Sequence, residues 1–329
     1  MKPIIKKYKH QIFECISIEN EIVEAAFLPE IGGKMIALKD KDTQQQFLLE
    51  PQNASKKYMK ATYGADFSHF DVSGFDECFP TVEASGPFPD HGEVWSGSWD
   101  VSIEDQSLVF SFKGIKADYL FKKRISLFQN TVQMAYSVTN NMKEQFHYIW
   151  SAHPLFRINP GVRLILPENV SELFLNWSSD PNVGTYGDTI QWPVADLGGN
   201  RNIDLSSMTK HNTGLAIKCF SNVLHDGFVG LYHSAIDRTV SFEFDPHDVP
   251  YAGLWLCYGG WPTESPDKHV TIAIEPCSGR PDKLSNAVQR NEHQTIEPGE
   301  TKTWDMNIGI WPGLKKSSSI HTGAHFRSI

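Results

Sequence analysis

Short apolar segments with a two-residue period recur along most of the 329-residue chain and restrict it to a fold built from strands. In residues 131–139, apolar side chains alternate with polar ones, which is typical of a strand with one buried face. Segments of similar length are bounded by Gly, Pro, Asn and Asp at residues 10–18, 21–28, 34–40 and 107–114, and several more strands are expected within residues 213–244. The sequence therefore predicts one all-β domain of antiparallel strands over residues 1–314, with a short helix at 282–291 and a frayed tail at 315–329.

Composition excludes several classes of protein. The net charge of -9 and the lack of a Lys/Arg block argue against a nucleic-acid partner. No apolar run of about 18 residues occurs, so we expect no membrane span. The N-terminus has no apolar stretch of signal-peptide length, and the five cysteines show no CxxC spacing. Both features favour free thiols and a cytoplasmic location.

Residues 270–280, VTIAIEPCSGR, contain the carboxylate of greatest interest. Val270, Ile272 and Ile274 alternate with small or polar residues, so Glu275 points away from the apolar face of the predicted strand. Because Pro276 follows at once, we expect Glu275 to lie at the strand end, beside a loop. A carboxylate placed there can serve as a general base, although a solvated surface glutamate fits the same pattern.

A histidine occupies a similar position in residues 146–156, FHYIWSAHPLF. Pro154 follows His153, which predicts that the strand ends there or lies at a sheet edge. His153 is a candidate proton donor, and a hydrogen-bonded structural histidine is the alternative.

Residues 52–100 have few strand signals and many polar, aromatic and turn residues. A long irregular stretch inside a compact domain is usually functional. It includes His91 and the neighbouring acidic residues Asp76 and Glu77. Metal ligation by Ser68-His69-Phe70-Asp71 and Asp76-Glu77-Cys78 is the minor alternative, because no second spaced His/Cys pair supports it.

The order of four motifs resembles the aldose 1-epimerase (galactose mutarotase-like) family. Gly32-Gly33 followed by KMIALKDKDTQQQFLL is similar to that family's opening segment, and Asp90-His91-Gly92-Glu93 to its first His-Gly motif. WSAHPLF around His153 is similar to its second His motif, and Ile274-Glu275-Pro276 with the later Glu297-Pro298-Gly299-Glu300 turn to its C-terminal region. The segment GFDECFPT, with Pro154 after His153, suggests a divergent branch.

This resemblance implies a large antiparallel β-sandwich and an enzyme that interconverts the anomers of an aldose. It implies Glu275 as general base, His153 as general acid and His91 as an orienting group. Ring opening needs an acid and a base on either side of the sugar, and no metal or organic cofactor. The implied partner is a monosaccharide, bound by a monomer or a homodimer.

Further residues are candidates for binding the sugar. Aromatic rings stack on sugar faces, carboxylates accept hydroxyl hydrogen bonds, and arginines bind anionic groups. By these criteria the candidates are Trp95, Trp255, Trp261, Asp76, Glu77, Arg157 and Arg280.

Other functions fit parts of the same pattern. A carbohydrate-binding protein of the same fold would need no proton donor and acceptor. A glycoside hydrolase or lyase would pair Glu275 with Asp76 or Glu77 across a glycosidic bond. A sugar-phosphate epimerase is a substrate variant, and the absence of an Arg/Lys cluster counts against it.

Overall fold

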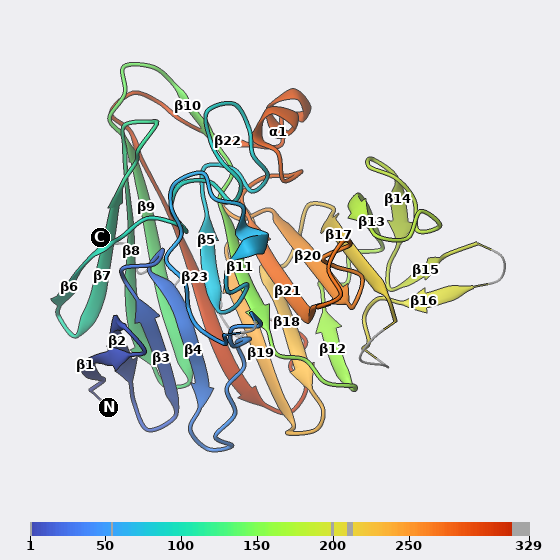
Figure 1. Cartoon of the computed structure of the whole chain (residues 1–329), viewed down its shortest axis with the longest axis horizontal. Helices are drawn as coiled ribbons and strands as arrows, with labels where there is room; N and C mark the ends of the chain where they lie inside the picture. The colour runs from blue at the N-terminus through green and yellow to red at the C-terminus, as the bar shows by residue number, and fades with distance from the viewer. Residues whose placement is uncertain (1, 54, 199–200, 209–212, 318–329) are drawn as a thin grey trace.

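In the computed structural model, two antiparallel sheets stack face to face (Figure 1). The structure describes residues 2–53, 55–198, 201–208 and 213–317. The larger sheet has 11 strands, in the spatial order β1 (Ile4–His10), β2 (Phe13–Glu19), β3 (Val23–Leu28), β4 (Lys34–Asp40), β5 (Phe75–Cys78), β11 (Ser151–Phe156), β21 (Val270–Cys277), β20 (Tyr251–Tyr258), β17 (Leu215–Ser221), β13 (Glu172–Ser178) and β14 (Thr189–Gln191).

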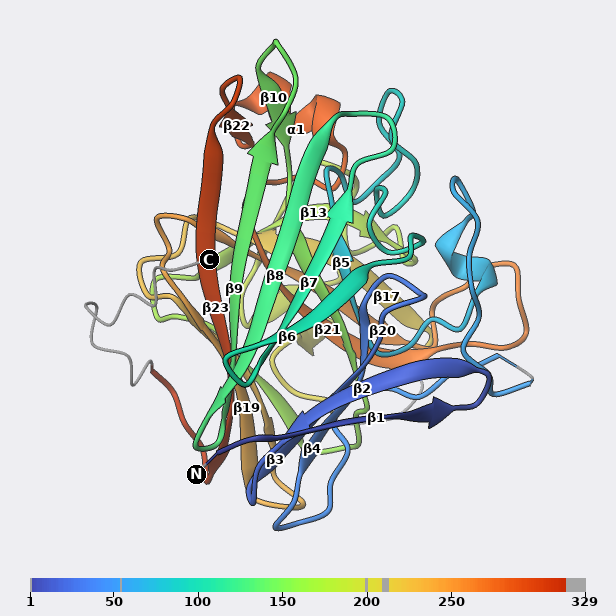
Figure 2. The same cartoon turned by 90° about the vertical axis from the view of Figure 1, so that its left-hand side faces the viewer.

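The second sheet faces the viewer in Figure 2. It has eight strands, in the order β12 (Val162–Ile165), β18 (Phe228–His233), β19 (Arg238–Phe244), β23 (Thr301–Pro312), β9 (Thr131–Asn140), β8 (Tyr119–Phe128), β7 (Ser107–Lys113) and β6 (Asp100–Glu104). Two small sheets pair β10 (Phe146–Tyr148) with β22 (Gln294–Ile296) and β15 (Val194–Asp196) with β16 (Asn202–Asp204). The predicted all-β class is confirmed.

The main core lies between the two large sheets. In β9 the residues predicted to face inward, Val132, Met134, Tyr136 and Val138, are all buried. Ile272 and Ile274 of β21 join the same core from the opposite sheet. Alternation therefore puts Ala273 and Glu275 on the outer face of the 11-stranded sheet.

A second, smaller apolar cluster covers that outer face. Phe67, Val72 and Trp95 come from the segment between β4 and β6 and pack on Leu155 of β11 and Ala273 of β21. This segment contains the short strand β5 and a 3-10 turn, η1 (Phe67–His69), and is otherwise irregular. It forms one wall of the pocket described below.

The Gly32-Gly33 turn has the backbone role expected from the sequence. Gly32 has a φ of 77°, and a Cβ there would lie 2.2 Å from the carbonyl oxygen of Trp95. Only glycine fits so close an approach.

The predicted helix is present as α1 (Leu284–Arg290), which ends at Asn291 in the left-handed conformation. No helix in the described part of the chain has the length and apolarity needed to cross a membrane. The predicted tail lies outside the described residues from position 318 onward.

Candidate active site

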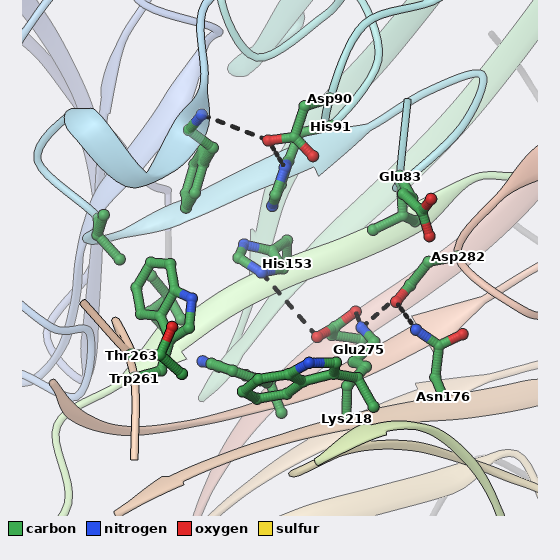
Figure 3. A pocket seen from close by; sticks show the side chains of 16 residues that line it. Glu83, Asp90, His91, His153, Asn176, Lys218, Trp261, Thr263, Glu275 and Asp282 are labelled. Atoms are coloured by element: carbon green, nitrogen blue, oxygen red, sulfur yellow. Dashed lines mark hydrogen bonds and ion pairs between the residues drawn. The ribbon is translucent and has the colours of Figure 1, made fainter. Parts of the chain in front are cut away.

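A pocket of about 530 Å³ opens on the outer face of the 11-stranded sheet (Figure 3). Its floor is formed by side chains of β11, β21, β20, β17 and β13, and the segment between β4 and β6 forms one side. The lining residues are Phe67, Val72, Val82, Glu83, Asp90, His91, His153, Leu155, Asn176, Trp177, Lys218, Trp255, Trp261, Thr263, Glu275 and Asp282.

Glu275 lies at the centre of this floor and is fully buried. Its Oε2 accepts hydrogen bonds from the Lys218 ammonium and from Ser151 Oγ, the latter at 3.4 Å. Its Oε1 has no hydrogen-bond partner among the described residues and lies 4.0 Å from His153 Nε2. One carboxylate oxygen is therefore held and the other faces the pocket.

The strands carrying Glu275 and His153 do not end where the prolines predicted. Pro276 lies within β21 and Pro154 within β11, and β11 is a central strand between β5 and β21. Between these two strands, Ser151 pairs with Cys277 and Leu155 with Ala273 in one register, but the pairing is interrupted between these positions. Both prolines lie in this interruption, where a missing N–H removes no ladder bond.

The two histidines differ in their electrostatics. Burial, together with the nearby charges of His91 and Lys218, lowers the pKa of His153 well below its usual value. Burial also acts to lower the pKa of His91, but the carboxylates of Asp90, which contacts Nδ1 at 2.9 Å, and of Glu275 and Asp76 together outweigh it, so the net change is upward. Near neutral pH, His153 is therefore neutral and His91 is the imidazole more readily protonated.

Backbone and ring contacts fix the position of His91. It has a φ of 58°, which non-glycine residues seldom adopt and which often marks a functional site. Its ring stacks on Phe67 with centroids 4.1 Å apart. The ring of His153 meets it edge to face, with centroids 5.0 Å apart.

On the other side of Glu275 lies a group of polar side chains that the sequence did not single out. Lys218 of β17 contacts Glu275, and its Nζ lies 3.3 Å from Asp282 Oδ1. Asn176 Nδ2 donates a 2.9 Å hydrogen bond to Asp282 Oδ2. The one available signal was Lys218 itself, a lone charge in the apolar segment LAIKCFS.

Burial dominates the charge states of this group. It raises the pKa of Asp282 to about 6, with help from the carboxylate of Glu275 and against the attraction of Lys218. Burial alone would lower the pKa of Lys218, but the carboxylates of Asp282 and Glu275 raise it above its usual value. Lys218 is therefore a permanent cation between two carboxyl groups.

Two of the three tryptophans predicted to bind sugar line the pocket. Trp255 of β20 and Trp261 pack edge to face with centroids 5.8 Å apart, and Trp177 lies 5.8 Å from Trp255 on its other side. Together Trp177, Trp255 and Trp261 form an aromatic wall. Trp95 is buried beneath Phe67 and donates its indole N–H to the carbonyl oxygen of Asp90, so it supports the loop and does not line the pocket.

Both acidic candidates of β5 also lie outside the lining. Asp76 is buried on the pocket side of the sheet, where its Oδ2 lies 3.1 Å from Lys34 Nζ. Glu77 faces the main core, where it accepts hydrogen bonds from Trp150 Nε1 at 2.8 Å and Tyr136 Oη at 3.1 Å. Alternation along β5 explains why these neighbours point to opposite faces.

The two candidate arginines are bound elsewhere. Arg280 donates to the carbonyl oxygen of Ser221 at 2.7 Å and lies over the ring of Tyr251. Arg157 is half-exposed and lies 3.5 Å from Glu50. The described part of the chain contains no group of three or more His, Cys, Asp or Glu side chains arranged to hold a metal ion.

Comparisons with known proteins identify the family. Residues 14–309 match the family described as Aldose 1-epimerase. No curated protein matches the sequence. Among solved structures, similar folds include a galactose mutarotase-like protein from Clostridium acetobutylicum, with 16% identity and a TM-score of 0.65 over 94% of this chain and 99% of that one.

Two further structures show the same fold at low identity. One is a galactose mutarotase-like protein from Lactobacillus casei, with 16% identity, a TM-score of 0.62, and coverage of 90% of this chain and 100% of that one. The other is a TPR-domain containing protein from Parabacteroides distasonis, with 15% identity and a TM-score of 0.68. The match covers 96% of this chain and 50% of that one. Because the family match spans most of the sequence, the chain belongs to the aldose 1-epimerase family.

Proposed function

We propose that this protein interconverts the α and β anomers of a free aldose bound in the pocket. The observation that carries the proposal is the pair formed by Glu275 Oε1 and His153 Nε2, which are 4.0 Å apart. That separation is too long for a direct hydrogen bond but suits an oxygen that bridges the two groups. The adjacent aromatic wall offers faces for a sugar ring.

The chemistry needs two coupled proton transfers. Glu275 Oε1 removes the proton of the anomeric hydroxyl while the ring oxygen gains a proton and the bond from C1 to the ring oxygen breaks. The open aldehyde rotates about its C1–C2 bond. Reclosure on the other face, with both transfers reversed, gives the second anomer and restores each side chain.

The two histidines share the acid role in this proposal. His153 is the imidazole nearest Glu275, but its lowered pKa leaves it without a spare proton near pH 7. His91, whose pKa is raised with Asp90 as a cause, is the more readily protonated imidazole and is the proton source. In one concerted step His153 passes a proton to the ring oxygen and takes one from His91, whose ring meets it edge to face, so no imidazolate forms.

Pocket charges favour an uncharged sugar over a phosphorylated one. The lining cations of the described structure, Lys218 and protonated His91, each pair with at least one carboxylate. Arg157 and Arg280, the arginines predicted to bind an anionic group, do not line the pocket. An anionic sugar would also meet Glu83 and Asp90 at the pocket wall.

The hydrolase alternative finds less support. It requires a second carboxyl group across the glycosidic bond from Glu275. Glu77 is buried in the main core and Asp76 is paired with Lys34, so neither predicted partner flanks a ligand in the pocket.

Saturation-transfer NMR of anomeric exchange, run on a panel of free aldoses at catalytic protein concentration, tests the proposal. We expect faster exchange for at least one neutral aldose and none for its 6-phosphate. Binding without faster exchange would instead identify a carbohydrate-binding protein. Release of reducing sugar from an oligosaccharide would identify a hydrolase.

A further inference from the structure

The side chain of Lys218 in β17 extends across strand β20 to Glu275 in β21, and a glycine in β20 leaves room for this contact. In the sheet order β21, β20, β17, the residue of β20 opposite Glu275 is Gly253. A Cβ at Gly253 would lie 3.3 Å from Glu275 Oε2, the oxygen that Lys218 contacts, and 3.2 Å from the ring of Phe220. Both distances are tighter than ordinary packing, so a side chain there would crowd the contact between lysine and carboxylate.

A second local feature holds the ammonium group of Lys218 in place. Strand β13 carries a bulge between Leu175 and Trp177, and the extra residue is Asn176. Bulges re-aim side chains, and here Asn176 and Trp177 both line the pocket although they are consecutive. Asn176 binds Asp282, which in turn lies against the Lys218 ammonium (Figure 3).

We propose that Lys218 is a positioning residue for the general base, held in place by Asp282 and Asn176. The proposal rests on the function proposed above, the interconversion of the anomers of an aldose. The ammonium binds Glu275 Oε2 and so fixes the carboxylate with Oε1 toward His153 and the sugar. It also gives the fully buried carboxylate a counter-charge in direct contact, which an apolar neighbour would not do.

The charge around Glu275 comes from several elements, and Lys218 is the cation in direct contact with it. The polar and titratable groups that face Glu275 from other elements are Lys218, Asp282, His153, Ser151, His91 and Cys78. With Lys218 removed, the two carboxyl groups of Glu275 and Asp282 would face each other without a counter-charge. Glu275 would then take up a proton at higher pH and would no longer have a fixed rotamer.

The test compares Lys218→Met with the wild type in the anomeric exchange assay across pH. We expect kcat to fall on the order of a hundredfold, with KM changing little, because misplacing a reacting group costs about that much. The acidic limb of the kcat/KM profile should move to higher pH by about one to three pH units. Gly253→Ala, which crowds the contact but leaves every charge in place, should lower kcat and move that limb less than Lys218→Met does.

Two controls separate positioning from general loss of stability. Lys123→Met removes another buried lysine, whose Nζ lies 3.4 Å from Glu77 Oε1 in the main core, and should leave the pH profile unchanged. The double variant Lys218→Met/Asp282→Asn removes one charge of each sign and so limits the folding penalty. A folded double variant with wild-type kcat and an unmoved acidic limb would overturn the proposal.

A readout without sugar distinguishes this proposal from the proposed function. With ¹³C-labelled glutamate, the carboxyl resonance lost in Glu275→Gln identifies Glu275, and its pH titration can be compared between wild type and Lys218→Met. A midpoint higher by about one to three pH units in the variant supports the role of Lys218 even if no sugar is turned over. Equal midpoints would overturn the role of Lys218 even if the wild type interconverts anomers.

Discussion

Glu275 Oε1 and His153 Nε2 face each other across 4.0 Å from neighbouring strands of one sheet. Both side chains are buried, and both residues line the pocket. A carboxylate and an imidazole so placed can exchange protons with one bound hydroxyl group.

Replacing Asp90 should change the pH range of catalysis. Asp90 raises the pKa of His91 against the opposing effect of burial. In Asp90→Asn that pKa falls, so His91 loses its proton at lower pH. The alkaline limb of kcat/KM should therefore move to lower pH by about one pH unit or more.

Glu83→Gln is the matched control for this change. It removes another carboxylate from the pocket wall, but one that is half-exposed and paired with Lys283. The alkaline limb should stay in place. Equal movement of the limb in both variants would show that total pocket charge, and not the contact between Asp90 and His91, determines it.

Replacing Glu77 should affect stability and not sugar binding. Its carboxylate accepts from Trp150 and Tyr136 and lies beside Lys123 in the main core. In Glu77→Ala these donors lose their partner, which should cost about 3–5 kcal/mol of unfolding free energy. Denaturant unfolding and sugar titration of the folded fraction measure the two effects, and a selective loss of sugar affinity would contradict the assignment.

Asp76 should make stability depend on pH. Burial raises the pKa of Asp76 from 3.8 to about 6. Between these two values the folded state holds the proton more tightly than the unfolded state, so the contribution of Asp76 is present below pH 4 and is lost as pH rises through 6. The unfolding free energy of the wild type minus that of Asp76→Asn should fall by on the order of 3 kcal/mol across this range. A constant difference would contradict the assignment.

The aromatic wall should contribute to affinity more than to turnover. Trp255 lies between Trp177 and Trp261 and lines the pocket. Trp255→Ala should raise KM about tenfold, equivalent to about 1.4 kcal/mol, with kcat nearly retained. Trp192→Ala, which removes a partly buried tryptophan that packs at the main core, is the control and should leave KM unchanged.

Much of the fold could be predicted because the apolar alternation is local. The inward residues of β9 follow a two-residue period that needs no tertiary information. The same reasoning put Glu275 on the face opposite Ile274, as observed. It failed on strand ends, because the rule for proline assumes an unbroken ladder, and β11 and β21 are not paired around Pro154 and Pro276.

The polar network of the site could not be predicted, because it depends on the order of strands in the sheet. Lys218 and Glu275 are 57 residues apart and meet only because β17 and β21 flank β20 at Gly253. Likewise, Asp76 and Glu77 were predicted as a pair although alternation separates them across the sheet. The strand β5 that carries both has only four residues and lies within the long irregular stretch of residues 52–100, so the sequence pattern did not reveal it.

The most direct test of the central claim is saturation-transfer NMR of anomeric exchange with wild type and Glu275→Gln side by side. The substitution keeps the shape of Glu275 but removes the proton acceptor, so we predict that sugar still binds while the enzyme-dependent exchange is lost. Exchange at the wild-type rate in Glu275→Gln would contradict the role of Glu275 as general base and, with it, the proposed mechanism.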